Sequence, residues 1–470
     1  MPPRNTPTGR AGVAPAGPNP HGTAPESAGR ATPSSLTRRR LLTGGAGLLG
    51  AGALASLAAC GTPSASGATQ QNLSFWHLLS GPDGVTMGSL VDGFNGSQDV
   101  ASLTQTVLAW GSPYYTKLAM ASAGGRAPDV AIMHAARVPG YAPGGLLDSW
   151  DMDLFAELGI REEDFPERIW AKSLHDGELT AVCLDSHPFV LYYNTEIAEA
   201  AGALGSDGLL EEATTPEQFR DLAARLGDAS DGGHGLAFGY LGDGSNMWRM
   251  FSTYYTQMGG TVELPIGGTM QYDEGLAVDT LEWILSLIDG DIGNASHDGG
   301  TAISEFITGK AGMFYGGVWE TGNYKAQGVP FDISLVPNVF GTPAAYADSH
   351  AFVLPHQTNP DPERRRLVHE FVAYVLKNSL DWAAAGHIPA YSPVVDDPAY
   401  DDLVPQSHYA DATDYLVYDP EAWFSGSGSD FHRYFGDHMQ NVFMRTVPPI
   451  DGLNGFVERI NALLAKPSPV

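Results

Sequence analysis

Short apolar runs that alternate with stretches of helical spacing are the feature that most constrains this fold. Strands are expected near residues 73–76, 102–108 and 127–134, with helical spacing in each interval between them. The third run is almost wholly apolar, as in a strand buried on both faces of a sheet. Strands and helices that alternate at this interval predict βαβ units and an α/β fold.

The same alternation continues towards the C-terminus. Further strands are expected near 189–193 and within 309–319, where a strand is followed by a loop. Thr215 and Gln218 form a capping-box pattern around Pro216, which predicts a helix that starts there. Apolar stripes near 281–288, after residue 362 and near 456–464 predict three more helices. The 410 residues after position 60 are enough for two packed cores.

The N-terminal segment has the pattern of an export signal. Residues 37–42 resemble a twin-arginine signal centred on Arg38 and Arg39, and residues 41–59 carry no charge. Two small residues then precede Cys60, which resembles a bacterial lipobox. The resemblance implies that residues 1–59 are leader and signal, that Cys60 receives a lipid such as palmitate, and that 60–71 form a flexible tether. The alternative is an uncleaved anchor, although the Gly-rich run is short of the ~20 apolar residues of a stable span.

The charge balance narrows the possible partners. The first 59 residues hold six of the 25 Lys and Arg and one of the 54 Asp and Glu, so the remainder has 19 basic and 53 acidic residues and a net charge of −34. Such a surface repels phosphate backbones and anionic lipid headgroups. We therefore expect no nucleic-acid partner and no electrostatic membrane binding beyond the lipid anchor.

The second cysteine of the chain stands alone. Cys183 lies within the apolar run 179–184 and has no partner for an intramolecular disulfide once Cys60 is lipidated. No Cys/His spacing in the sequence is typical of a zinc site. We expect Cys183 to be a buried structural thiol.

The order of segments resembles the extracellular solute-binding proteins of ABC importers, in the group that includes maltose- and other carbohydrate-binding members. The likeness covers about residues 70–465. It rests on the following segments in this order: 73–76, 127–130 (Ala-Pro-Asp-Val), 145–148 (Gly-Leu-Leu-Asp), 181–194, 214–219, 309–319 and 386–394.

The resemblance implies a two-lobed periplasmic-binding-protein-like fold with the ligand held between the lobes. Chain crossings are expected near 187–192, near 349–353 and around residue 400. The first lobe then comprises 72–188 plus 350–400, and the second comprises 189–349 plus 401–470. Ligand closes such lobes by a hinge motion. The resemblance also implies a monomer that delivers its ligand to an ABC transporter permease, with no cofactor and no catalysis.

Candidate ligand-binding residues follow the expected strands, because ligands in open α/β sheets lie beyond the carboxyl ends of the strands. They are Trp76, His77, His134, Asp185, His187, Trp319 and Glu320, joined by His350 at the second crossing and by Trp248 and Tyr391 in loops that the family often uses. Aromatic rings suit the C–H faces of a sugar, and Asp, Glu, His and Trp supply acceptors and donors for its hydroxyls. This mixture predicts a neutral polyol ligand, because a carboxylate or phosphate would call for arginine and only Arg137 and Arg249 occur among these loops.

Some of these candidate residues also suit a purely structural role. Trp76 and Trp248 also suit core positions, Tyr391 also suits packing between its neighbouring prolines, and His187 also suits a role in shaping the chain before Pro188. The four histidines at positions 77, 134, 187 and 350 also raise a transition-metal site, although their spacing fits no compact metal motif.

Two other functional classes remain open from the sequence. An extracellular glycoside hydrolase would need two carboxylates that flank one bond, and no pattern marks such a pair. The nucleophile elbow, the His-Glu-x-x-His motif and the phosphate-binding Gly loop are all missing from the sequence. A binder of a peptide or another non-sugar solute is equally compatible with the fold.

Overall fold

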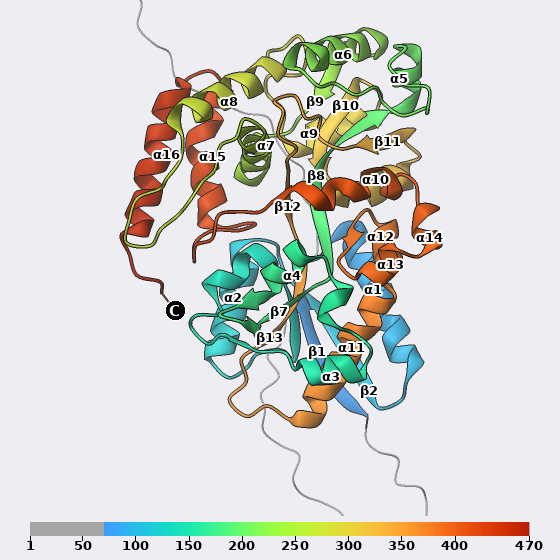
Figure 1. The fold of residues 1–470 in the computed structure, drawn as a ribbon, viewed down its shortest axis with the longest axis vertical. Helices are drawn as coiled ribbons and strands as arrows, with labels where there is room; N and C mark the ends of the chain where they lie inside the picture. The colour runs from blue at the N-terminus through green and yellow to red at the C-terminus, as the bar shows by residue number, and fades with distance from the viewer. Residues whose placement is uncertain (1–69, 470) are drawn as a thin grey trace, which may run out of the picture. The chain divides into compact units, whose positions relative to one another are not determined.

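Two β-sheets covered by helices form the part of the chain described by the computed structural model, residues 70–469 (Figure 1). The α/β fold class predicted from the sequence is therefore confirmed. The export signal with Arg38, Arg39 and Cys60 lies outside the described residues.

The first sheet has the strand order β2-β1-β3-β13-β4, with β7 paired to β13. β1 runs parallel to β2 and β3, and β13 returns antiparallel to β3. Its strands are β1 (Gln71–His77), β2 (Ala101–Val107), β3 (Val130–His134), β4 (Leu147–Asp148), β7 (Ala181–Cys183) and β13 (His350–Pro355). Helices of the first lobe are α1 (Gly81–Ser97), α2 (Ser112–Ala123), α3 (Met152–Glu157), α4 (Glu167–Ser173), α11 (Pro362–Lys377) and α12 (Ser379–Ala384). A small hairpin of β5 (Leu174–His175) and β6 (Glu178–Leu179) lies outside this sheet.

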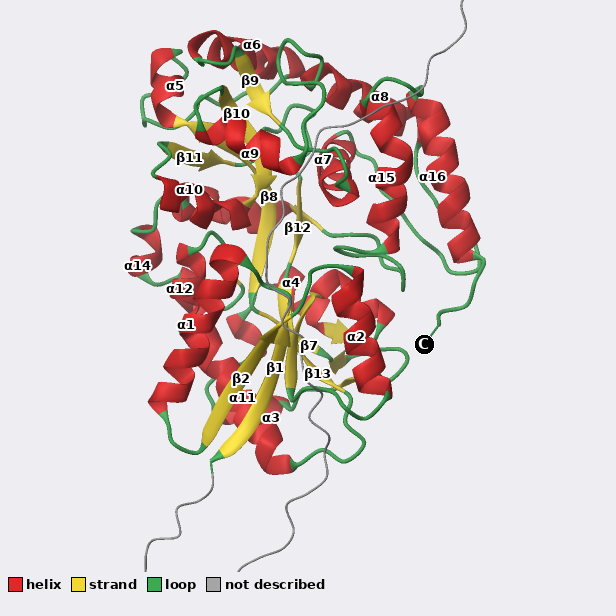
Figure 2. Cartoon of the chain, turned by 180° about the vertical axis from the view of Figure 1, so that it is seen from behind, coloured by secondary structure: helices red, strands yellow, loops and turns green. Residues whose placement is uncertain are grey.

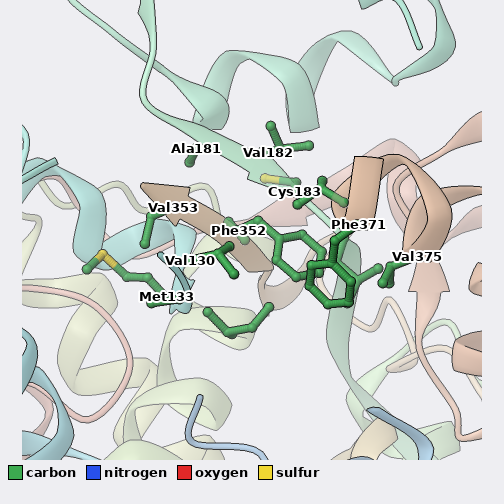
Figure 3. Close-up of a cluster of buried hydrophobic side chains, with 14 of the residues drawn as sticks. Val130, Met133, Ala181, Val182, Cys183, Phe352, Val353, Phe371 and Val375 are labelled. Atoms are coloured by element: carbon green, nitrogen blue, oxygen red, sulfur yellow. The ribbon is translucent and has the colours of Figure 1, made fainter. Parts of the chain in front are cut away.

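The core of the first lobe joins segments from both ends of the lobe's sequence. Phe352 on β13 and Phe371 on α11 pack edge to face with ring centroids 5.8 Å apart, beside Val130 of β3 (Figure 3). Cys183 is completely buried in the same cluster, and burial raises the pKa of its thiol to about 12. The expected buried structural thiol is therefore confirmed.

The second sheet has the strand order β15-β12-β8-β10-β9, and β11 and β14 also pair with β8. Its strands are β8 (Asp185–Asn194), β9 (His234–Ala237), β10 (Ala311–Gly317), β11 (Phe331–Ser334), β12 (Ala345–Asp348), β14 (Ile388–Pro389) and β15 (Leu416–Val417). Helices of the second lobe are α5 (Thr195–Ala200), α6 (Pro216–Ala229), α7 (Gly244–Gln257), α8 (Glu274–Leu287), α9 (Gly299–Ile307), α10 (Thr321–Gln327), α15 (Asp430–Phe443) and α16 (Pro449–Leu464).

Helices far apart in the sequence pack together in the second lobe. In Figure 1, α15 and α16 at the red end of the colour bar lie beside α7 and α8, and aromatic contacts between α7 and α15 fill the space. Phe435 of α15 meets Trp248 and Phe251 of α7 with ring centroids 5.1 and 5.2 Å apart. The C-terminal segment is thus part of this core.

The chain passes between the two sheets at three places. β7 of the first sheet is followed directly by β8 of the second, and β12 of the second sheet is followed by β13 of the first, with only Ser349 between them (Figure 2). The third passage leads from α12 of the first lobe into β14, which pairs with β8 of the second sheet, and continues through two short helices, α13 (Ser392–Val395) and α14 (Pro398–Asp401), to the 3-10 helix Gln406–Tyr415.

The starts of α1 and α6 show how the local sequence begins a helix. α1 begins at Gly81, and Pro82 occupies one of the first helical positions, where no hydrogen-bonded N–H is needed. At α6 the Thr215 hydroxyl accepts from the Gln218 N–H as predicted, but the Gln218 side chain accepts from the N–H of Thr214 at 2.8 Å. The reciprocal half of the capping box is therefore shifted by one residue. Within residues 70–469, no helix combines the length and the apolar character needed to cross a membrane.

Candidate ligand-binding cleft

A cavity of about 440 Å³ is lined by residues from both lobes. This volume is within the range of small-molecule sites. The first lobe contributes the start of α1, Trp110, His134 and His350, and the second contributes Arg249, Trp319, Glu320 and Asn323. His187 lies on β8, at the point where the chain passes between the sheets.

Three nearly buried imidazoles form one wall of this cavity. The ring centroids of His187 and His350 are 4.3 Å apart, and those of His134 and His350 are 5.0 Å apart. These residues come from β8, β13 and the end of β3, and β13 pairs with β3 so that His350 stands opposite His134. Strand pairing alone therefore brings two of the three rings together.

The hydrogen bonds behind the imidazoles define what each ring offers to a ligand. The Tyr115 hydroxyl accepts from the His134 backbone N–H at 3.2 Å and lies 2.6 Å from His134 Nδ1, so we assign the ring proton of His134 to Nε2. His187 and His350 each direct Nδ1 to the Asp185 carboxylate, at 3.1 and 2.8 Å, which leaves their Nε2 atoms as acceptors. The wall thus combines one donor and two acceptors.

Burial keeps two of these rings neutral. Desolvation is the largest cause that lowers the pKa of His187, to about 3, and it holds the pKa of His134 well below its ordinary value. The neighbouring imidazole of His350 disfavours a positive charge on either ring and lowers both pKa values further. A wall of neutral donors and acceptors suits hydroxyl groups, because each hydroxyl can donate and accept.

The Asp185 carboxylate lies behind the His187 and His350 rings and holds both by hydrogen bonds. Its side chain is fully buried and accepts hydrogen bonds from Trp382 Nε1 at 2.7 Å and from the His350 backbone N–H at 2.8 Å, in addition to the two imidazoles. His387 Nδ1 lies 3.0 Å from the same carboxylate. We refer to Asp185, His187, His350, Trp382 and His387 as the Asp185 hub.

The Asp185 hub also contacts Asp83 at the start of α1 through His387. His387 Nε2 lies 3.1 Å from an Asp83 carboxylate oxygen, and its ring stacks on Trp382 with centroids 4.5 Å apart. Burial lowers the pKa of His387, but Asp83 and Asp185 outweigh burial and raise it to about 10. Burial likewise opposes ionisation of Asp185, yet the surrounding imidazoles hold its pKa well below the usual value. A protonated His387 therefore lies between two carboxylates.

Trp319 presents an aromatic surface on the opposite lobe. It follows β10 in a short 3-10 helix, and the Arg249 guanidinium lies 4.7 Å from the centre of its ring. A Cβ at Gly317 would lie 2.0 Å from this ring, so the ring position requires glycine there. Burial raises the pKa of the neighbouring Glu320 carboxyl.

A second cavity of about 470 Å³ adjoins the first. Both are lined by Trp110 and Asp243, and the second continues along the first turn of α7 and along α15. Trp110 is 48% exposed, which is unusual for so large an apolar side chain. Together the two cavities provide room for a ligand longer than one sugar ring.

The ten predicted ligand residues fall into three groups. His134, His187, Trp319, Glu320 and His350 line the first cavity, and Asp185 lies directly behind the imidazoles. The remaining residues lie elsewhere: Trp76, His77, Trp248 and Tyr391.

Each of these four has a local reason for its position. Trp76 packs beside the first core with Lys117 over its ring, and His77 lies 3.0 Å from the Gln105 side chain. Trp248, only 1% exposed, lies within α7 and donates to Asp419 at 2.6 Å. Tyr391 packs against Phe165.

The histidine cluster also has the residue types of a metal site. Asp185, His187, His350 and His387 offer ligand atoms within 4.8 Å of one another, whereas His77 and His134 from the sequence-based set are not in this group. However, the Nδ1 atoms of His187 and His350 lie 3.1 and 2.8 Å from the carboxylate oxygens of Asp185 as hydrogen-bond donors do, and His387 Nδ1 forms an ion pair with the same carboxylate at 3.0 Å. Zinc would require Zn–N distances of about 2.0–2.1 Å from nitrogens freed of that carboxylate. The arrangement fits a hydrogen-bonded carboxylate better than an ion.

Sequence reasoning missed Trp110, Asp83 and His387 as parts of this region. Trp110 follows β2 closely, so the strand-end rule applied to this second strand would have identified it. Asp83 and His387 carry no comparable signal, because their partnership joins positions more than 300 residues apart.

The comparisons with known proteins agree with this geometry. A family model described as bacterial extracellular solute-binding protein matches residues 104–379. No curated protein sequence matches this chain.

Similar folds are found among solved structures. The GacH receptor of Streptomyces glaucescens, solved also with acarbose, has a TM-score of 0.70 and 19% identity over 84% of this chain and 98% of its own. The cyclic alpha-maltosyl-1,6-maltose binding protein of Arthrobacter globiformis has a TM-score of 0.66 and 18% identity over 84% and 99%. UgpB of Mycobacterium tuberculosis, in complex with glycerophosphocholine, has a TM-score of 0.69 and 17% identity over 84% and 98%. At such identities the likeness establishes the two-lobed fold.

Proposed function

Because this chain belongs to the bacterial extracellular solute-binding proteins, we propose that it captures a carbohydrate and delivers it to an ABC transporter permease. The ligand class is an oligosaccharide or a glycoside, held between the two lobes by hinge closure. The protein binds this ligand without transforming it.

The observation that carries the carbohydrate assignment is the pairing of Trp319 and Trp110 with the imidazole wall. The two tryptophans come from opposite lobes and line the same cavity, so both can contact the C–H faces of a sugar ring. The imidazole wall supplies both donors and acceptors, which the hydroxyl edges require.

The relatives support the same ligand class. Two of the three similar structures are described with acarbose or with a cyclic maltose derivative. The third holds glycerophosphocholine, so a non-sugar solute is the principal alternative to be tested.

The two lobes and the anchor complete the proposal. We assign 72–188 plus 350–400 to the first lobe and 189–349 plus 401–470 to the second, and the separate apolar cores support this division except at β14, whose Ile388 packs with residues of the second lobe. A lipid on Cys60, after twin-arginine export through Arg38 and Arg39, would hold the protein at the outer face of the cytoplasmic membrane as a monomer. The family's description as extracellular supports this location.

The test is a thermal-shift screen of the purified full-length protein. Monosaccharides, oligosaccharides, peptides and glycerophosphodiesters are each added in excess, and the bound compound is recovered and weighed by mass spectrometry. A ligand at a hundred times its dissociation constant adds about 2.7 kcal/mol of stability, which raises the melting temperature measurably. A shift with one saccharide class and its recovery intact are the expected result. Cleavage of the sugar, or a shift with peptides or phosphodiesters alone, would refute the proposal.

A further inference from the structure

Arg249 is the one arginine among the residues that line the first cavity. It lies on α7, directly after the core residue Trp248, and is only 8% exposed. Its guanidinium lies 4.7 Å from the Trp319 ring centre and 5.9 Å from that of Tyr346. The cation is thus held between aromatic faces at the cavity surface.

This guanidinium has no anionic partner among the described residues. No carboxylate of residues 70–469 lies within ion-pair distance of Arg249, and its Nε has no hydrogen-bond acceptor there. The hydrogen bond that its Nη1 donates to Asn246 Oδ1 is long at 3.4 Å. A buried charge without an anionic partner is unfavourable, so an anion bound at this position would stabilise it.

The three carboxylates that line the cavity interact with groups other than Arg249. Asp83 faces the protonated His387 at 3.1 Å. Asp243 caps α7 by accepting from the Asn246 N–H at 2.9 Å. Glu320 accepts a long hydrogen bond from Asn323, and burial raises its pKa. The charge of Arg249 therefore remains available to a ligand.

The surroundings of Arg249 indicate the kind of ligand. Its neighbour Trp319 offers an aromatic surface for a sugar ring, and both side chains line the same cavity, so a substituent of a ring held there can reach the guanidinium. His134 on the opposite wall adds an N–H donor. Guanidinium groups bind carboxylates and phosphates through two parallel hydrogen bonds.

We propose that the ligand is an acidic saccharide, in which a sugar ring on Trp319 carries an oxyanion that pairs with Arg249. The proposal rests on the carbohydrate assignment above and specifies its chemical class. A uronate carboxylate and a sugar phosphate share this chemistry. The formal net charge of −29 does not prevent binding, because charges on the distant surface are screened beyond about 8 Å at physiological ionic strength.

Isothermal titration of the full-length protein with matched sugars tests this assignment. The pairs are galactotriose with trigalacturonate, and glucose with glucuronate and glucose 6-phosphate, all at physiological ionic strength. We expect the acidic member to bind on the order of ten-fold more tightly or better. The carboxylate and phosphate arms identify which oxyanion is preferred.

Substitution of Arg249 is the second part of this test. Arg249→Gln is expected to remove the preference for the acidic sugar, measured as the ratio of the acidic to the neutral affinity, because any effect through the Trp319 ring, which Arg249 also contacts, lowers both affinities alike. Arg249→Lys, which keeps the charge, should retain part of the preference and serves if the Gln variant does not fold. The matched control is Arg137→Gln, because Arg137 packs on Tyr115 outside this cavity.

The outcomes separate this inference from the proposed function. Neutral sugars that bind as tightly as acidic ones, or an equal loss for both in Arg249→Gln, would overturn the acidic assignment and keep the carbohydrate function. Binding of free phosphate without any saccharide would overturn both.

Discussion

Trp319 is the residue whose side chain is best placed to contact a sugar ring. It lines the cavity from the second lobe, and its ring is braced on one side by Arg249. Trp110 lies in the same cavity on the first lobe. Each lobe therefore contributes one tryptophan to the cavity. Substitution of either tryptophan tests its contact with the sugar while the imidazole wall is left in place.

Trp319→Ala is expected to weaken saccharide binding by about 1–3 kcal/mol, the scale of a lost aromatic contact. Isothermal titration measures the affinity, and the thermal melt of the free variant reports on its stability. Trp423→Ala is the control, because Trp423 is half-buried against Phe424 and lines neither cavity. Unchanged affinity in a variant with a normal melt would remove Trp319 from the site.

His387 predicts an alkaline loss of stability. Its pKa is about 10 in the folded chain and about 6.5 when unfolded, since burial is outweighed by Asp83 and Asp185. A raised folded pKa contributes stability that is complete below pH ~6.5 and is lost as the pH rises through ~10. The melting temperature should therefore fall between these pH values.

The matched variant isolates this histidine from general alkaline effects. His387→Gln should have a lower melting temperature at pH 7 and a shallower decline towards pH 10 than the original protein. Parallel declines in the two proteins would show that His387 is not protonated in the folded state.

At the scale of elements, the end of β10 decides where Trp319 lies. The strand ends at Gly317, whose φ of −91° is accessible to any residue. Its Cβ position is nevertheless occupied by the Trp319 ring, at 2.0 Å. Glycine is needed there for space and not for backbone conformation.

Gly317→Ala is therefore expected to displace the Trp319 ring and to reduce saccharide affinity by a similar factor to Trp319→Ala, while the backbone keeps its conformation. Tryptophan fluorescence with and without ligand follows the ring. Gly96→Ala in α1 is the control, because a Cβ at that glycine meets nothing within 4 Å. If Gly317→Ala bound sugar normally, the cavity would tolerate a different ring position than the one described.

At the scale of the whole molecule, three chain passages connect the lobes that share the cavity. Two of them are strand-to-strand, β7 to β8 and β12 to β13, and the Asp185 hub lies where these passages meet. The hub ties β8 to β13 and α12 through one carboxylate. We infer that the hub holds β8, β13 and α12 in fixed positions at the chain passages while the rest of each lobe moves.

Binding of a saccharide is expected to close the lobes, because contacts with Trp110 and with Trp319 can then form at once. Small-angle X-ray scattering should record a smaller radius of gyration with saturating ligand. Trp319→Ala at the same ligand concentration should contract less. An unchanged radius in the original protein, despite saturation in titration, would rule out hinge closure.

The local pattern of the sequence was sufficient for much of the fold. The apolar run at β3, the lone Cys183 and the Thr215 cap of α6 follow from side chains within a few residues of one another, so their structures were predictable. The strand-end rule also selected four cavity residues, because strand ends converge wherever a parallel sheet forms, and the expected second crossing selected His350.

Tertiary structure decided the rest. Trp248 and Arg249 are adjacent in the sequence, yet packing of α7 against α15 buries the first in the core and leaves the second at the cavity. Asp185 meets His350 and Trp382 across 165 and 197 residues, a pairing that no local pattern specifies. Local periodicity was enough to predict which segments form helices and strands. It also predicted that polar and aromatic residues follow the strands, because these features depend on near neighbours in the chain. Only the packed lobes determined which of those residues share one cavity and which charge was left without a partner.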